Sequence, residues 1–340
     1  MLKEFLNQVL AGEDLSRQEA RQVMFTIMSG KATEAQIGAL LAALRMKGET
    51  SEEIAGFAES MRSFTVKVNC KGSEALDTCG TGGDRKGTFN VSTATAFVVA
   101  GAGVAVAKHG NHGVSSSCGS ADVLKELGVS LELSPQAVGT ALDTVKVAFL
   151  YAPSFHPAMK YAGKPRRELG FRTVFNVLGP LTNPVGTQCQ LLGVYARELT
   201  EKIADVLLRL GVKRAMVVHG LDGMDEISTA APTQVSEVVN GSIRTYLLEP
   251  EKYGIKAGTM EDYQGSTPQS NAVTLLSILQ GKVDAKRDIV LVNAAAALMV
   301  ADKAETLKEG LILAAESIDS GAALAKLEEL KAYSQKYKGA

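Results

Sequence analysis

Asp77-Thr-Cys-Gly-Thr-Gly-Gly-Asp84 follows a short apolar run and precedes a predicted helix over residues 92–102, capped by Asn90 or Ser92. A strand, a glycine-rich loop and a helix in this order are typical of parallel α/β sheets, where such loops lie at the carboxyl edge. Glycine lacks a Cβ, so the loop backbone can approach an anion closely. Alone, the loop is equally compatible with a structural turn, and it matches neither the dinucleotide-binding nor the Walker motif.

A second anion-binding feature follows the loop. A strand is expected over residues 104–107, and Lys108 comes directly after it, where its charge could neutralise a phosphate. His109 alone is compatible with an ordinary loop histidine. Four serines between residues 115 and 120 precede another predicted helix. Two helix starts rich in small polar residues indicate a ligand with more than one phosphate.

The remaining pattern predicts an α/β domain. Strands are expected over residues 147–151, 189–195 and 214–218, with helices between them. This alternation predicts a mainly parallel central sheet. The Asn-Gly pair at 240–241 predicts one antiparallel hairpin, and the chain from about residue 271 is expected to be helical.

We expect two domains. Residues 1–67 predict a small all-helical domain, and residues 68–340 an α/β domain that binds the phosphorylated ligand. Capping-box patterns in the first domain begin at Ser16, Thr33 and Thr50. Helices within about 156–183 interrupt the strand alternation and are expected to pack on the helical domain, which would place a site between the two domains.

Composition excludes several classes of protein. The 340 residues carry a formal net charge of −1, which disfavours sequence-independent nucleic-acid binding. The N-terminus lacks the apolar core of a signal peptide, and no apolar run is long enough to span a membrane. The four cysteines form no CxxC pair, so reduced thiols and a cytoplasmic location are expected.

An acidic segment supplies candidate metal ligands. Asp222-Gly-Met-Asp225-Glu226 follows a predicted strand, and adjacent carboxylates are difficult to bury without a cation. Oxygen ligands without sulfur favour Mg²⁺. The alternative is a solvated acidic turn. Beside a polyphosphate site, the metal interpretation is favoured.

Two arginines lie in the helical interruption. Arg166 or Arg167 could hold a substrate carboxylate through a bidentate fork. A surface arginine paired with Glu168 or solvent is an equally valid interpretation of the local sequence.

These motifs together resemble one enzyme family. In chain order they are Gly80-Thr-Gly-Gly-Asp84, Asn90-Val-Ser-Thr93, Lys108-His-Gly-Asn111, Gly119-Ser-Ala-Asp-Val123, Asn176-Val-Leu-Gly-Pro-Leu-Thr-Asn-Pro184 and Asp222-Gly-Met-Asp-Glu226. The whole chain resembles the anthranilate phosphoribosyltransferases of tryptophan biosynthesis. The resemblance implies transfer from 5-phosphoribosyl-1-pyrophosphate (PRPP) to anthranilate, a fold similar to pyrimidine nucleoside phosphorylases, and a homodimer that forms through the helical domain.

The resemblance also implies roles for individual residues. The PRPP-binding residues would be Gly80, Gly82, Gly83, Asp84, Thr88, Asn90, Ser92, Thr93, Lys108 and Ser120. The anthranilate site would comprise Gly80, His109, Asn111, Pro153, Arg166 and Gly179. Two Mg²⁺ ions would be held by Ser92, Asp225 and Glu226. Lys108 would act electrostatically, and no catalytic acid or base is expected.

The sequence departs from the family pattern at two places. His112 stands where many members have arginine, and Ser117-Cys118 replaces a common Lys-Ser pair. Two positive charges near the expected phosphate site are therefore absent. Two alternatives are a pyrimidine nucleoside phosphorylase, which would not need the acidic pair, and a non-enzymatic relative that binds nucleic acid.

Overall fold

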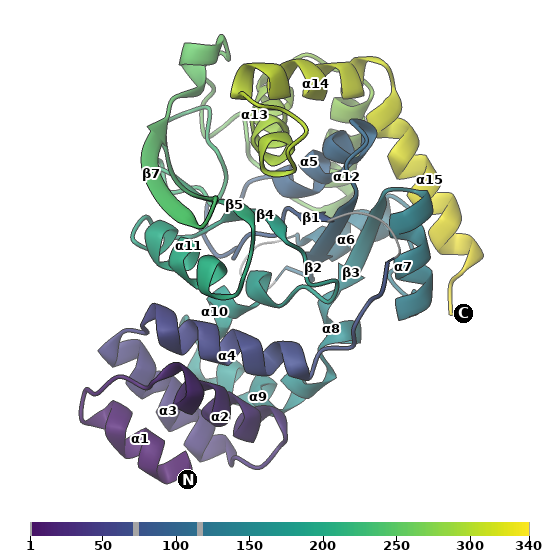
Figure 1. Ribbon diagram of the computed structural model, residues 1–340. Coiled ribbons are helices and arrows are strands. Elements are labelled where there is room, and N and C mark those ends of the chain that lie inside the picture. Colours follow the sequence, from purple (N-terminus) through teal and green to yellow (C-terminus); the bar gives the residue numbers. More distant parts are fainter. Residues whose placement is uncertain (1, 71–74, 114–117, 340) are drawn as a thin grey trace.

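A computed structural model describes residues 2–70, 75–113 and 118–339 (Figure 1). The serines at 115–117, predicted to line a phosphate site, lie outside the described residues. A group of N-terminal helices lies below a larger part that contains the sheet, as the sequence predicted. None of the described helices combines the length and apolar character that crossing a bilayer requires.

The N-terminal helices begin where capping chemistry predicts. They are α1 (Leu2–Leu10), α2 (Arg17–Met28), α3 (Glu34–Lys47) and α4 (Ser51–Ser63). Complete capping boxes precede α2, α3 and α4 at Ser16, Thr33 and Thr50, so the three predicted boxes are confirmed.

The described residues form one sheet in the order β3-β2-β1-β4-β5-β6-β7. Its strands are β1 (Leu76–Asp77), β2 (Val106–Gly110), β3 (Val147–Tyr151), β4 (Cys189–Gly193), β5 (Arg214–Gly220), β6 (Thr233–Val239) and β7 (Ser242–Leu248). The first five strands pair in parallel, which confirms the mainly parallel sheet. The Asn240-Gly241 hairpin joins the antiparallel strands β6 and β7, which confirms the predicted hairpin. Strands β5 and β6 are also antiparallel, a pairing that the sequence did not predict.

One predicted strand end and one predicted capping bond differ from the structure, although Asn90 is the N-cap residue of α5 as predicted. Lys108 lies inside β2 and not after it, because β2 runs between β1 and β3 and its Lys108 position pairs with Phe149 of β3. Helix α5 (Val91–Gly101) follows Asn90, yet no side chain caps it. The Asn90 amide instead bonds Cys118 and Asn271, so the first amides of α5 receive no side-chain oxygen at the cap position.

Helices cover both faces of the sheet (Figure 1). One face packs against α5, α6 (Ser120–Glu126), α12 (Pro268–Leu279), α13 (Ala285–Val300), α14 (Leu307–Asp319) and α15 (Ala322–Lys336). The other packs against α7 (Pro135–Thr144) and α11 (Leu199–Arg209). The short helices α8 (Ala152–Phe155) and α10 (Phe175–Leu178) lie between the sheet and the N-terminal helices, whereas α9 (Lys160–Leu169) lies among those helices and contacts α3 (Figure 1).

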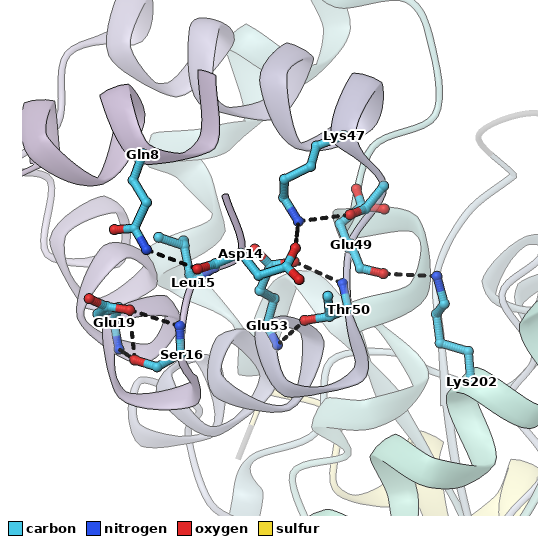
Figure 2. Close-up of polar contacts among 11 residues, drawn as sticks. Gln8, Asp14, Leu15, Ser16, Glu19, Lys47, Glu49, Thr50, Glu53 and Lys202 are labelled. Carbon is cyan, nitrogen blue, oxygen red and sulfur yellow. Dashed lines mark hydrogen bonds and ion pairs between the residues drawn. The ribbon is translucent and has the colours of Figure 1, made fainter. Parts of the chain in front are cut away.

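One apolar core joins the N-terminal helices to the sheet. It includes Leu44 of α3, Phe57 of α4, Leu207 of α11 and Val217 of β5. A polar contact also joins the two parts: Lys202 of α11 donates to the Glu49 carbonyl at 2.8 Å (Figure 2).

The buried Glu53 carboxylate fixes the segment before α2 and the connection between α3 and α4. Lys47 lies 3.0 Å from the fully buried Glu53 carboxylate, which also accepts from the Leu15 and Thr50 amides (Figure 2). The cation and the two amide donors offset the cost of burying this charge, so the carboxylate holds α3 and α4 in one arrangement.

Candidate active site

The glycine loop rests on the end of β4 and against the acidic loop. Thr81 N donates to the Gly193 carbonyl at 2.8 Å. A Cβ added to Gly80 would lie 3.1 Å from Gly193 O and 3.2 Å from Asp225 Oδ2. Only glycine fits this approach without a shift, so the loop amides and the acidic loop are held together. Gly82 and Gly83 have φ angles of +63° and +80°, which favour glycine.

Three carboxylates gather beneath this loop. The Asp225 amide lies 3.5 Å from Asp84 Oδ2. Burial, followed by the charge of Asp84, raises the pKa of Asp225 to about 7. Burial and the charge of Asp225 raise the pKa of Glu226 well above its usual range, although Lys108 opposes the shift. Such mutual repulsion is relieved by a cation, and three carboxylates suit a hard divalent ion such as Mg²⁺.

Lys108 is a buried cation among neutral partners. Its side chain lies within β2, and the residue is 3 % exposed. Nζ donates to Ser92 Oγ at 3.1 Å and lies 3.4 Å from the Thr78 carbonyl and hydroxyl. No carboxylate of the described residues lies within 4 Å of it. The charges of Asp77 and Glu226 interact with this ammonium, but neither carboxylate forms a direct ion pair with it, so Lys108 can bind an anion at this point.

The start of α5 adds hydrogen-bonding groups. The Ser92 backbone bonds Glu226, and the Thr93 hydroxyl is buried without a partner among the described residues. Thr88 forms an isolated bridge with Gln264, and Ser120 Oγ donates to the Asn111 carbonyl at 3.4 Å. Ser92 and Thr93 lie in the first turn of α5, and Ser120 begins α6, so these hydroxyls lie at helix N-termini, where the helix dipole favours negative charge.

The predicted acceptor residues come from two parts of the fold. His109 is buried in β2, and Asn111 follows that strand. Pro153 is exposed on α8, whereas Gly179 ends α10, where an added Cβ would meet nothing within 4 Å. The Arg166 guanidinium on α9 lies 5.0 Å from the centroid of the Phe175 ring.

The Arg166 side chain is half-buried and makes no ion pair with a described carboxylate. Burial lowers its pKa, and no carboxylate of the described residues pairs with it, so the alternative pairing with Glu168 is not seen. The neighbouring Arg167 is exposed.

Sequence reasoning missed several residues of this region. Arg172 donates to the Gly83 carbonyl, and its guanidinium lies 4.3 Å from the centroid of the Tyr195 ring. A lone basic residue between two short helices gives little signal. Asn271 of α12 supports Asn90 at 3.1 Å, although the two residues are far apart in sequence.

Asp77 was quoted in the sequence only as the start of the motif. It is fully buried; Oδ1 accepts from the Cys79 and His109 amides at 3.0 and 3.2 Å, and Oδ2 from Asn183 Nδ2 at 2.7 Å. Burial raises its pKa to about 6. Potential ligand atoms of Asp77, Cys79 and His109 lie within 4.8 Å of one another. Because both carboxylate oxygens already accept hydrogen bonds, we interpret Asp77 as an anchor for the glycine loop and β2.

The departures from the family pattern have a local structural role. His112 Nδ1 lies 2.5 Å from Asp122 Oδ1, and the second Asp122 oxygen accepts from the Gly113 and Gly119 amides. The Cys118 side chain is buried beside Asn90, where it fills space as expected for a small thiol. Ser117 lies outside the described residues.

Comparisons with known proteins cover both parts of the chain. Family models described as "Glycosyl transferase family, helical bundle domain" and "Glycosyl transferase family, a/b domain" match residues 3–65 and 72–324. An anthranilate phosphoribosyltransferase of Moorella thermoacetica is 54% identical over 333 residues, which cover 98% of each chain. That of Pelotomaculum thermopropionicum is 55% identical, over 97% of this chain and 96% of the relative.

Solved structures of similar fold carry the same enzyme name as these relatives. The anthranilate phosphoribosyltransferase of Thermus thermophilus has a TM-score of 0.93 and 42% identity, over 97% of this chain and 99% of that chain. The enzyme of Saccharomyces cerevisiae, in complex with PRPP and Mg, has a TM-score of 0.91 and 30% identity over 98% of each chain. Both family models match, and more than half of the aligned residues are identical to those of the Moorella and Pelotomaculum enzymes, so the chain belongs to the anthranilate phosphoribosyltransferase family.

Proposed function

We propose that this chain transfers the 5-phosphoribosyl group of PRPP to the amine of anthranilate and releases pyrophosphate, as a step of tryptophan biosynthesis. The observation that carries the proposal is the carboxylate cluster of Asp84, Asp225 and Glu226 beneath the glycine loop, with Lys108 and the start of α5 beside it. Acidic groups alone would repel a diphosphate, and a lysine alone would not need them. Together they suit a metal–diphosphate group.

The donor half of the site has a clear division of tasks. Two Mg²⁺ ions, held by Ser92, Asp225 and Glu226, would neutralise charge that develops on the leaving pyrophosphate. Lys108 and the amides of the glycine loop and of α5 stabilise the same charge. The remaining donor contacts come from Gly80, Gly82, Gly83, Asp84, Thr88, Asn90, Thr93 and Ser120.

The acceptor half must hold the aromatic amine in line with the ribose carbon. Arg166 binds the carboxylate, a role that its half-buried guanidinium without an acidic partner among the described residues supports. Gly80, His109, Asn111, Pro153 and Gly179 line the remaining surface. The amine is neutral near pH 7, so no residue is assigned as a catalytic acid or base.

The division at residue 67 belongs to the same proposal, with 1–67 as the helical domain and 68–340 as the PRPP-binding domain. The 156–183 helices join the first of these, as the 2.6 Å contact between Lys164 and Glu34 supports. We propose a cytoplasmic homodimer that forms through the helical domain. Its exposed Leu10, Phe25 and Met46 side chains supply apolar surface for that contact.

A direct assay tests the reaction. Purified protein with PRPP, anthranilate and Mg²⁺ should consume anthranilate and release pyrophosphate. The loss of anthranilate fluorescence measures the consumption. The control replaces the substrates with a pyrimidine nucleoside and inorganic phosphate, and nucleobase release there would favour the phosphorylase. Salt-dependent DNA binding without turnover would favour the non-enzymatic relative.

A further inference from the structure

The segment between α9 and α10 reaches the glycine loop through one side chain. Arg172 lies in this segment, and its guanidinium donates a hydrogen bond to the Gly83 carbonyl. A guanidinium carries only donors, so the direction of this bond is fixed. The next residue, Thr173, donates its amide to Asn176 Oδ1 at 3.0 Å. This turn fixes the backbone that carries Arg172.

Tyr195 supports both the guanidinium and the loop. Its ring centroid lies 4.3 Å from the Arg172 guanidinium, and its amide donates to Thr81 Oγ1 at 3.2 Å. The ring also packs against the apolar core that the N-terminal helices share with the sheet. A planar guanidinium stacked on a ring loses little further freedom when it forms a hydrogen bond. Arg172 and Tyr195 therefore hold the loop on both sides of Gly82, at Gly83 and at Thr81.

The bond to the Gly83 carbonyl decides where the next amide points. Gly83 and Asp84 are joined by a trans peptide, in which the carbonyl and the following N–H point in opposite directions. Because the carbonyl is directed at Arg172, the Asp84 amide points away from Arg172. Within the described part of the chain, no acceptor bonds this amide. It is a donor without a partner, and the Asp84 side chain beside it belongs to the carboxylate cluster.

Steric constraints alone do not set this orientation. Gly82 and Gly83 have positive φ angles, which glycine adopts at little cost, and a Cβ added to Gly82 would meet nothing within 4 Å. The peptide could therefore rotate and present its carbonyl in place of the amide. A carbonyl oxygen repels a diphosphate, whereas a backbone amide binds one. The contact with Arg172 selects the orientation that binds an anion.

We propose that Arg172 is a positioning residue for the donor: by holding the Gly83 carbonyl, it directs the Asp84 amide at the diphosphate of PRPP. The identity of the diphosphate rests on the proposed function, whereas the orientation of the peptide does not. Arg172 acts through the loop and needs no contact with the ligand. It lies in the same short segment as Arg166, so this segment serves both the donor and the acceptor halves of the site.

The wild-type protein gives the first test. Crystals grown with Mg²⁺ and pyrophosphate should show a pyrophosphate oxygen within hydrogen-bond distance of the Asp84 amide, while the Gly83 carbonyl stays on Arg172. A structure in which the Asp84 amide makes no contact with pyrophosphate would overturn the proposal. This measurement needs no variant and no turnover.

Variants of Arg172 test its effect on affinity. Arg172→Met keeps an apolar stem but no donor, and it should weaken the binding of pyrophosphate with Mg²⁺ about tenfold, measured by calorimetry. The PRPP KM should rise by a similar factor, with the anthranilate KM unchanged. Arg172→Lys retains a donor for the carbonyl and should recover most of the loss, which a role in packing alone does not predict. Unchanged pyrophosphate affinity in Arg172→Met would contradict the proposal.

The peptide itself supplies the direct readout in the same variant. A crystal structure of Arg172→Met should show the Gly83–Asp84 peptide rotated or in two orientations. A peptide that keeps its wild-type orientation without Arg172 would mean that the loop sets this orientation by itself, and the proposal would be wrong.

The matched control is Arg17→Ala. Arg17 Nη2 also donates to a backbone carbonyl across the two parts of the molecule, that of Arg209 at 2.9 Å, but it makes no contact with the glycine loop. Its pyrophosphate affinity should stay at the wild-type value, and an equal loss there would refute a specific role of Arg172. The expected binding of pyrophosphate without any turnover of anthranilate would instead refute the proposed function and leave the role of Arg172 standing.

Discussion

Asp225 combines a structural cost with a proposed metal-binding role. Its carboxylate is held beneath Gly80 beside two other acids, which disfavours its ionised form. We expect Asp225→Asn to stabilise the metal-free protein by about 1 kcal/mol or more, because the buried charge is removed. Turnover should fall and the Mg²⁺ requirement should rise, because one metal ligand is lost.

Thermal unfolding without metal and initial rates across Mg²⁺ concentrations measure the two effects. Asp302→Asn is the control, since Asp302 pairs with Arg214 on the surface. Normal rates at limiting Mg²⁺ in Asp225→Asn would remove Asp225 from the metal site.

Arg166 gives the second prediction at this scale. Its guanidinium lies against the ring of Phe175 without an acidic partner, so Arg166→Ala should cost mainly the contact with the substrate carboxylate. The anthranilate KM should rise about tenfold to a hundredfold while the PRPP KM stays within twofold. Steady-state kinetics measure both. The exposed neighbour Arg167 supplies the control, and an equal effect of Arg167→Ala would argue against a specific role.

Site residues could be predicted from the sequence where they occur together in short motifs. The glycine loop and the acidic pair are each a short run of neighbouring residues, so local reasoning found both. Asn183 could not be assigned in this way, because it reaches Asp77 across 106 positions of the chain. The burial of Lys108 was also missed, because it depends on strands that pack on either side of β2.

At the scale of elements, the end of β4 positions the acidic loop. A Cβ added to Gly193 would lie 1.6 Å from the Asp225 carbonyl, so Gly193→Ala must displace that loop. We expect a loss of stability of at least 2 kcal/mol together with weaker Mg²⁺ binding. Gly38→Ala in α3 is the matched control, because its added Cβ meets nothing within 4 Å.

Gly38→Ala should instead stabilise the protein by about 0.5–1 kcal/mol, since alanine is the better helix former. Urea unfolding measures both variants. If Gly193→Ala kept wild-type stability and Mg²⁺ binding, the close approach of β4 to the acidic loop would be wrong. The alternation of strands and helices was predictable from the sequence, whereas this contact was not, because backbone proximity leaves no pattern in side-chain polarity.

At the scale of the whole molecule, the two parts share one apolar core. Leu44 and Phe57 of the N-terminal helices belong to the same buried cluster as Leu207 of α11. The sequence predicted both parts but not their joint core, because the order of the strands and the packing of α11 are tertiary properties. A pair of histidines crosses the same boundary: His109 lies in β2, and its Nε2 lies 3.2 Å from Nε2 of His156, which follows α8.

This pair should make stability depend on pH. His156 has a pKa of about 4 in the folded protein, against about 6.5 for an unperturbed histidine. Between these values the unfolded chain binds a proton that the folded protein excludes, so this group lowers stability as pH falls, by about 1.4 kcal/mol per pH unit.

In His156→Gln that contribution is absent. The stability difference between wild type and variant should therefore shift in favour of the variant by about 2 kcal/mol from pH 7 to pH 5. Urea unfolding at the two pH values measures this shift, and titrating groups that do not interact with His156 cancel because both proteins contain them. A difference that stays constant with pH would mean that His156 accepts a proton freely in the folded protein, which its burial between the two parts of the molecule argues against.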